Sequence, residues 1–397
     1  MAAKPHHSTG QASAKGSVFN DPKVRGIIYQ LVLVAGLVYF FWSIVQNAAH
    51  NLEKQNIASG FGFVENTAGF LPNQTLISLT ATSTYGQALL AGLLNTLLVA
   101  VIGIILATIV GFVMGVARLS NNWVVSKLAT MYIEIVRNIP LLLQLFFWYF
   151  AVLRNLPNPK NSSNLFGVFH LNNRGLFMPR PIFEAGSEAM FVALAVGIVG
   201  AIAVSIWAKK RQMATGQRFP AFWTGLGLII LLPVVAYFLS GRPVSYDFAE
   251  LKGFNYKGGM KVIPEFVGLT LALTIYTGAF IAEIVRAGIL AVNHGQTEAA
   301  HALGLRNGPT LRLVIIPQAM RVIIPPLTSQ YLNLTKNSSL AVAIAYPDIV
   351  SVGGTVLNQT GQAIEVIAVW MIVYLSISLI TSILMNWYNR SIALVER

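Results

Sequence analysis

The stretch "LALTIYTGAFIAEIVRAGIL", residues 271–290, decides the fold because it joins a membrane-spanning length to a charged end. A bilayer crossing needs about 20 mostly apolar residues. A second stretch, "MYIEIVRNIPLLLQLFFWYF" at 131–150, carries the same four letters, "EIVR". Each copy places a Glu and an Arg three positions apart beside an apolar run. The chain therefore repeats one charged arrangement beside two stretches that are each long enough to cross a bilayer.

The composition extends this prediction to the whole chain. Of its 397 residues, 55% are hydrophobic and only 10% are charged, whereas soluble domains carry about 25% charged residues. We therefore predict an all-α polytopic membrane protein. The net charge of +13 does not indicate nucleic acid, since no basic run is interleaved with stacking aromatics. Lys and Arg collect in the cytoplasmic loops of membrane proteins, so the expected partner of this charge is membrane lipid.

Hydropathy predicts eight transmembrane spans, with the third and seventh interrupted by prolines and polar residues. Their approximate bounds are 26–45, 89–115, 130–153, 189–208, 221–240, 264–289, 320–345 and 364–386. The polar segment 1–25 has no short apolar core followed by a cleavage site, so we expect a disordered cytoplasmic tail. With the N-terminus inside, the inner segments hold 17 of the 27 basic residues and five of the 14 acids. This bias predicts that both termini are cytoplasmic.

Both "EIVR" copies then lie at cytoplasmic ends of spans. Glu134 with Arg137, and Glu283 with Arg286, share a helix face at a spacing of three residues and can neutralise each other. They are either two self-neutralised anchors or parts of a cross-helix network that braces a gate. The sequence leaves both interpretations open.

The segment after the sixth span contains a short amphipathic helix, predicted over 298–303. Thr297 is its expected N-cap and Gly304 its expected stop. Its apolar residues are small or moderate in size, which suits a shallow groove on another protein. The alternative is an interfacial helix lying on lipid, which usually needs larger apolar residues.

The text of this segment resembles a known family. "EAAHALGL" followed by "RLVIIPQ" looks like the EAA loop of ABC-importer permeases, with Val314 and Ile316 as mild departures at aliphatic positions. "NTLLVAVIGIILATIVGFVMGVAR", "YIEIVRNIPLLLQLFFWYF", "YTGAFIAEIVRAGI", "GQTEAAHALGL" and "TKNSSLA" look like permeases of the polar-amino-acid uptake family, the histidine/glutamine type. The enlarged plan is most like the general L-amino-acid permease branch.

The resemblance implies a type I ABC-importer permease core of five helices, plus one N-terminal and two inserted spans. It divides the chain into a tail at 1–25, an extra span at 26–45, core parts at 89–153 and 264–397, and an insertion at 154–263. The EAA loop at 290–320 would dock a separate ATPase. The docking residues it implies are Glu298, Ala299, Ala300, Leu303, Gly304 and Pro317.

The resemblance also implies partners: an ATP-binding subunit, a second homologous permease and a periplasmic amino-acid-binding protein. This chain has no G-x-x-x-x-G-K-[ST] phosphate cradle. ATP and Mg would therefore act on the partner ATPase, with no cofactor or catalytic residue on this chain. No His cluster has metal-ligand spacing, so we expect no metal site. The expected location is the bacterial inner membrane.

Polar residues at membrane depth are candidates for a substrate path, although small polar residues also hold helices together. The candidates are Asn95, Gln144, Thr274, Thr277, Gln330, Asn333 and Lys336. Lys336 differs from the others because no acid lies within four residues, so it could bind the carboxylate of an amino acid. It could equally pair with an acid on another helix or reach the outer surface.

Two rival functions remain at this point. One is a gradient-driven secondary transporter or channel for small polar solutes, which would show an inverted repeat of spans. The four-residue echo of "EIVR" is too short to establish such a repeat. The other is a membrane scaffold without a conduction path, and the polar seventh span argues against it.

Overall fold

The computed structural model describes residues 22–54 and 59–392. Within these ranges, seven helices are long and apolar enough to cross a membrane, or eight if one bent pair counts as a span. This confirms a multi-pass helical protein with about the predicted number of spans. The predicted cytoplasmic tail, 1–25, lies almost entirely outside the described residues.

Most predicted spans correspond to one long helix each. These helices are α1 (Pro22–Lys54), α2 (Tyr85–Arg118), α5 (Glu188–Thr215), α6 (Ala221–Leu239), α7 (Pro264–Leu290), α10 (Ile316–Asn337) and α12 (Ala363–Ile392). The shorter helices are α3 (Trp123–Asn138), α4 (Leu141–Phe146), α8 (His294–Ala302), α9 (Asn307–Thr310) and α11 (Ile349–Thr360). Within its apolar stretch, α1 has no buried residue, so it does not contribute to the core.

The third predicted span, 130–153, is bent at the proline that the sequence indicated as an interruption. The segments Trp123–Asn138 and Leu141–Asn155 meet at an angle of 106°. Pro140 causes the break, because a proline disfavours helical geometry at the residue before it. Ile139 is accordingly extended, with φ −102° and ψ 128°. Beyond α4, a π-helical turn follows over Phe147–Val152.

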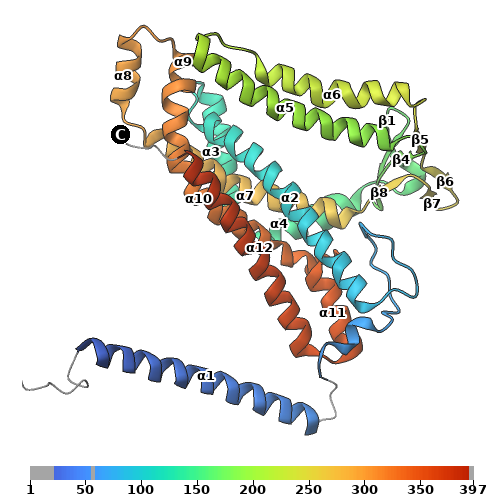
Figure 1. Ribbon diagram of the computed structural model, residues 1–397. Helices are drawn as coiled ribbons and strands as arrows, with labels where there is room; N and C mark the ends of the chain where they lie inside the picture. Colours follow the sequence, from blue (N-terminus) through green and yellow to red (C-terminus); the bar gives the residue numbers. More distant parts are fainter. Residues whose placement is uncertain (1–21, 55–58, 393–397) are drawn as a thin grey trace, which may run out of the picture.

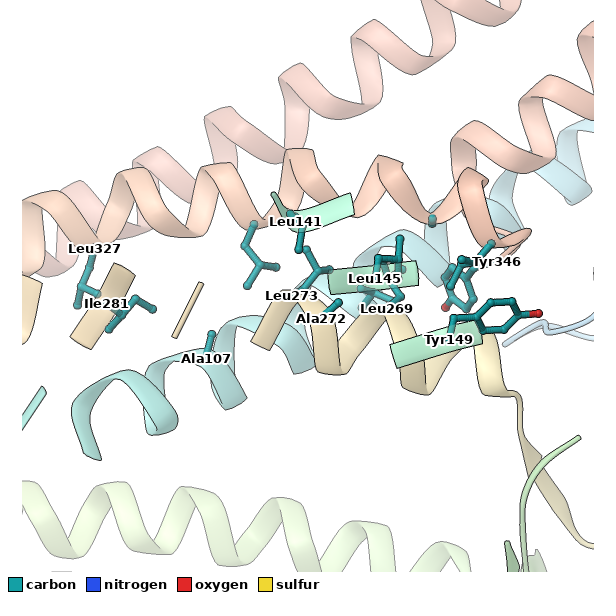
Figure 2. Packing of buried hydrophobic residues seen from close by; sticks show 14 of the residues in the cluster. Ala107, Leu141, Leu145, Tyr149, Leu269, Ala272, Leu273, Ile281, Leu327 and Tyr346 are labelled. Carbon is teal, nitrogen blue, oxygen red and sulfur yellow. The ribbon is translucent and has the colours of Figure 1, made fainter. Parts of the chain in front are cut away.

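The core forms where α2, α7 and α10 meet, with α3, α4 and α11 packed around them. Its buried side chains include Leu145, Leu269, Leu273 and Tyr346, which converge in the close view (Figure 2). Glycines let α2 and α7 approach closely. A Cβ added at Gly111 would lie 2.4 Å from Ile281 Cγ2, a packing by small residues that membrane helices commonly use.

The inserted helices α5 and α6 pack mainly against each other, as an antiparallel pair beside the core (Figure 1). The segments that flank this pair form three small antiparallel sheets, which the sequence did not predict. The strands are β1 (Ser163–Leu165), β2 (Phe169–Asn172), β3 (Gly175–Met178), β4 (Arg180–Phe183), β5 (Val244–Asp247), β6 (Glu250–Lys252), β7 (Asn255–Lys257) and β8 (Met260–Val262).

The sheets join the two ends of the insertion. Strand order is β1-β2-β3-β8 in the largest sheet, with Phe177 opposite Lys261, and β4 pairs with β5, with Arg180 opposite Asp247. The segment 154–188 is thus paired to 241–263 across the helices between them. One end of the α5–α6 pair is fixed by this layer, and the turn between the helices lies at the other end, near α9 (Figure 1).

Candidate functional site: a docking helix and the charged end of the bundle

The helix predicted at 298–303 exists, but it begins earlier. It is α8, His294–Ala302, and its N-cap is Asn293, whose side-chain oxygen accepts a hydrogen bond from the Gly295 amide at 2.8 Å. Thr297 lies inside the helix, so its assignment as N-cap was wrong. Gly304 follows the last turn with φ +76°, the left-handed geometry expected of a helix stop.

The outer face of α8 is open to solvent. Leu303 is 82% exposed, Ala299 is exposed, and the side chain of Glu298 is 72% exposed. Only Ala300 is buried among the implied docking residues, at 4% exposure. An exposed leucine beside small residues and a carboxylate is a surface that can enter a groove on another protein.

The N-terminal part of α8 is held to the body of the molecule. Its N-terminal side follows α7 after three residues, Ala291–Asn293. Gln318 on α10 donates to the Gln296 side chain at 3.2 Å. Pro317 is exposed and lies in the first turn of α10, directly after the π-helical turn Leu311–Ile315. A force on α8 is therefore passed to α7 and α10 together.

The second "EIVR" copy belongs to a cross-helix ion network. Arg118 at the end of α2 donates to Glu283 at 2.6 Å, and Glu283 also accepts from Arg286 at 2.6 Å. Arg118 lies 3.7 Å from Glu134 on α3. Arg137 does not pair with Glu134; its guanidinium lies 5.1 Å from the centre of the Phe280 ring. Only the second copy is neutralised within itself, through Glu283 and Arg286, and it is also part of the cross-helix network through Arg118.

Arg118 is the member of this network that the sequence analysis missed as a site residue. Its position could have identified it, because Arg118 is a basic residue at the end of the second apolar run, on the predicted inner side. The network joins the ends of α2, α3 and α7. Arg286 lies eight residues before the start of α8. The charges thus brace the same end of the bundle that carries the exposed docking helix (Figure 1).

Asn95 holds the fold together rather than facing an open path. Its side-chain amide donates to the carbonyls of Gln74 at 2.8 Å and Pro347 at 2.9 Å, and the residue is fully buried. Thr96, next to it, accepts from the Ile349 amide at 3.0 Å. These bonds tie α2 to the turn that begins α11.

Gln144 satisfies the backbone at the break of the third span. Its amide donates to the carbonyls of Val136 at 2.8 Å and Ile139 at 2.9 Å. The break leaves carbonyls without helical partners, and such groups must be bonded at membrane depth. Gln144 thereby stabilises the bend between α3 and α4.

The remaining candidates fall into two groups. Thr274 and Thr277 on α7 are buried, and the Thr274 hydroxyl has no hydrogen-bond partner within the described residues. On α10, Gln330 is half-buried, while Asn333 and Lys336 are exposed. Within 22–54 and 59–392, Lys336 forms no salt bridge. One side of α10 therefore carries three polar groups in the last turns of the helix, two of them exposed.

These features define a multi-pass membrane protein whose charged end carries a short, solvent-exposed helix. Residues 103–394 match the family described as "Binding-protein-dependent transport system inner membrane component", and the chain belongs to this family. It is a transport permease of the inner-membrane type.

Several curated relatives cover nearly the whole chain. A "General L-amino acid transport system permease protein" of Rhizobium johnstonii is 54% identical over 99% of this chain and 98% of its own length. A "Putative amino-acid ABC transporter permease protein" of Escherichia coli is 53% identical, covering 98% and 99%. A "Glutamate/glutamine/aspartate/asparagine transport system permease protein" of Rhodobacter capsulatus is 44% identical, covering 95% and 96%.

Proposed function

We propose that this chain is the membrane-spanning permease subunit of an ATP-driven importer of L-amino acids. The observation that carries the proposal is α8: a short helix, anchored to α7 and α10, that presents Glu298, Ala299 and Leu303 to solvent. The names of the full-length relatives support the amino-acid substrate.

Energy would come from a separate ATPase that docks on α8. No Walker A phosphate cradle occurs in this sequence, so ATP and Mg would bind on that partner. The interface would centre on Leu303, with Ala299 and Glu298 beside it. Gly304 and Pro317 would shape the turn that follows, while Ala300 packs inward.

A second, homologous permease would complete the transport path. Asn333 and Lys336 are exposed on α10 in the single chain, and charged groups on membrane helices usually face protein or water rather than lipid. Pairing two permeases along α10 would enclose these groups in an aqueous path. Lys336 would meet the substrate carboxylate there, while Thr274 and Thr277 would lie behind it in α7.

The division into a permease core, an N-terminal span and an insertion at 154–263 is part of this proposal. Both termini would lie in the cytoplasm, as the charge bias requires. The docking helix would then also be cytoplasmic, and the β-strand layer would lie outside. A periplasmic amino-acid-binding protein would approach from that outer side.

The test is purification of the full chain from its own membrane under mild conditions, followed by sequencing of whatever accompanies it. We expect a chain with a Walker A motif, and its loss when Leu303→Asp places a carboxylate on the docking face. Leu165→Asp is the matched control, because Leu165 on β1 is 59% exposed but lies far from α8. Purification of the wild-type chain alone would contradict the proposal.

A further inference from the structure

A cavity of about 520 Å³ lies between the insertion and the segment that follows the docking helix. Arg218, in the turn between α5 and α6, lines one side, and Gly308, Pro309, Arg312 and Leu313 line the other. The two sides are about ninety residues apart in sequence. Figure 1 shows the same approach, with the α5–α6 turn next to α9.

The charge around this cavity is of one sign. Residues 200–225 contain Lys209, Lys210, Arg211 and Arg218 and no acid, and residues 300–320 contain Arg306 and Arg312 and no acid. Neither Arg218 nor Arg312 forms an ion pair within the described ranges. Two guanidinium groups without carboxylate partners thus line one cavity, which favours an anion with several oxygens.

The aromatic residues nearby indicate that this end of the α5–α6 pair lies at a membrane surface. Trp207 near the end of α5 packs edge-on against Phe219 at 5.2 Å, and Trp223 opens α6 with 70% exposure. Tryptophan side chains are enriched at the level of lipid headgroups. The cavity is therefore at the depth where phosphates of lipids are found.

The lining of the cavity is also partly apolar, and this favours a ligand with an apolar part over a free anion. Leu313 is 59% exposed and Pro309 is exposed beside the two arginines. A free phosphate gains nothing from such surface, whereas the glycerol and first acyl carbons of a lipid would cover it.

We propose that this cavity binds the phosphate headgroup of an anionic phospholipid, with Arg218 and Arg312 as its ligands. The lipid would join the inserted α5–α6 pair to α9, directly after the docking helix. The binding of the lipid does not depend on the transport function. Only the statement that the lipid lies next to a docking helix rests on the proposed function.

The experiment is native mass spectrometry of the full-length chain in detergent with equimolar phosphatidylglycerol and phosphatidylcholine. We expect the wild type to retain phosphatidylglycerol in preference, and Arg218→Gln with Arg312→Gln to lower this retention by at least about threefold. The matched control is Lys209→Gln with Lys210→Gln, which also removes two positive charges, but from the last two turns of α5 outside this cavity. This control should keep the preference.

Three outcomes would overturn the proposal. The first is equal retention of the two lipids by the wild type. The second is an equal loss in both double variants, which would mean diffuse attraction to the basic end of α5. The third is displacement of the lipid by equimolar inorganic phosphate, which would make the ligand a soluble anion. The first and third use the wild-type chain, so they decide the matter even if the arginine variant misfolds.

Discussion

Arg118 on α2 and Glu283 on α7 are joined by a 2.6 Å ion pair, although 165 residues separate them. Glu283 also accepts from Arg286, so one carboxylate neutralises two guanidinium groups. The pair closes the end of the tightly packed α2–α7 contact. A movement of α8 that displaced the end of α7 would change the distance between Arg118 and Glu283.

Replacing Glu283 with Gln should destabilise the chain. Arg118 and Arg286 would lose the negative charge and one of the two carboxylate oxygens that accept from them, in a site where the Glu283 side chain is only 25% exposed. Loss of hydrogen bonds to charged groups costs about 1.5–3 kcal/mol each when burial is substantial, and partial exposure places this case near the lower value. The measurement is the melting temperature of the purified chain in detergent.

Glu134→Gln is the control for this prediction. Glu134 is 64% exposed and 3.7 Å from Arg118, and exposed pairs contribute about 0–1 kcal/mol. We expect a melting temperature close to that of the wild type. Equal effects of the two variants would show that the network does not centre on Glu283.

Reversing the charge of Glu298 should uncouple ATP hydrolysis from transport. Glu298 is exposed, and among the described residues its side chain bonds only to His294 of its own helix, at 3.0 Å, so Glu298→Arg should leave the fold intact while it changes the docking face. The measurement is ATPase activity and amino-acid uptake of the reconstituted complex. Glu250→Arg, an equally exposed reversal on β6, is the control. Normal uptake by Glu298→Arg would exclude docking at this face.

Lys336→Met should abolish amino-acid uptake without preventing assembly. Methionine keeps the length and apolar stem of the side chain but removes the cation that would bind the substrate carboxylate. Uptake and co-purification of partners are measured side by side. Lys257→Met, at the exposed last position of strand β7, removes the same charge from the strand layer and should keep uptake. Unchanged uptake by the Lys336 variant would exclude its role in the path.

The helices could be predicted from the sequence because bilayer thickness fixes their length and composition. The partners of individual polar residues could not. The carbonyl that Asn95 binds belongs to Pro347, 252 positions away, and no local pattern identifies it. The sequence showed that Pro140 interrupts the third span. It did not show that the Gln144 side chain donates to the carbonyls that the bend leaves without helical partners. The outer strands are three or four residues long, too short for an alternating pattern to indicate them.

The docking helix shows how a local rule can be right about one end and wrong about the other. Gly304 marked the stop correctly because a left-handed residue after a helix favours glycine. The predicted start of the helix was wrong because Thr297 and Asn293 are both residue types that cap helices. The structure uses Asn293, four residues earlier, since Gly295 is tolerated in the first turn.

Asn95→Leu should destabilise the fold, because two buried carbonyls would lose their donor. Leaving a buried polar group unpaired costs about 1–3 kcal/mol. Asn155→Leu is the matched control: its amide also donates to two carbonyls, of Phe150 and Ala151, but at an exposed site. Thermal melting should show a clearly larger loss for Asn95→Leu. A stable Asn95 variant with lost uptake would instead return this residue to the substrate path.

Stability should fall as pH rises from about 4 to about 7, because of Asp348. This residue caps α11, accepts from the Ser351 amide at 2.8 Å and has a second oxygen without a partner among the described residues. Burial raises the pKa of its carboxyl from 3.8 to about 7. Between these values the folded chain holds a proton that the unfolded chain has released, so each increase in pH favours unfolding.

The change across this window should be on the order of 3–4 kcal/mol at most. Asp348→Asn keeps the oxygen that caps α11 but cannot ionise, so its melting temperature should vary less between pH 4 and 7. The measurement is thermal melting of both proteins across this range in one detergent. Parallel curves for the two proteins would show that Asp348 ionises in the folded chain as readily as it does in water.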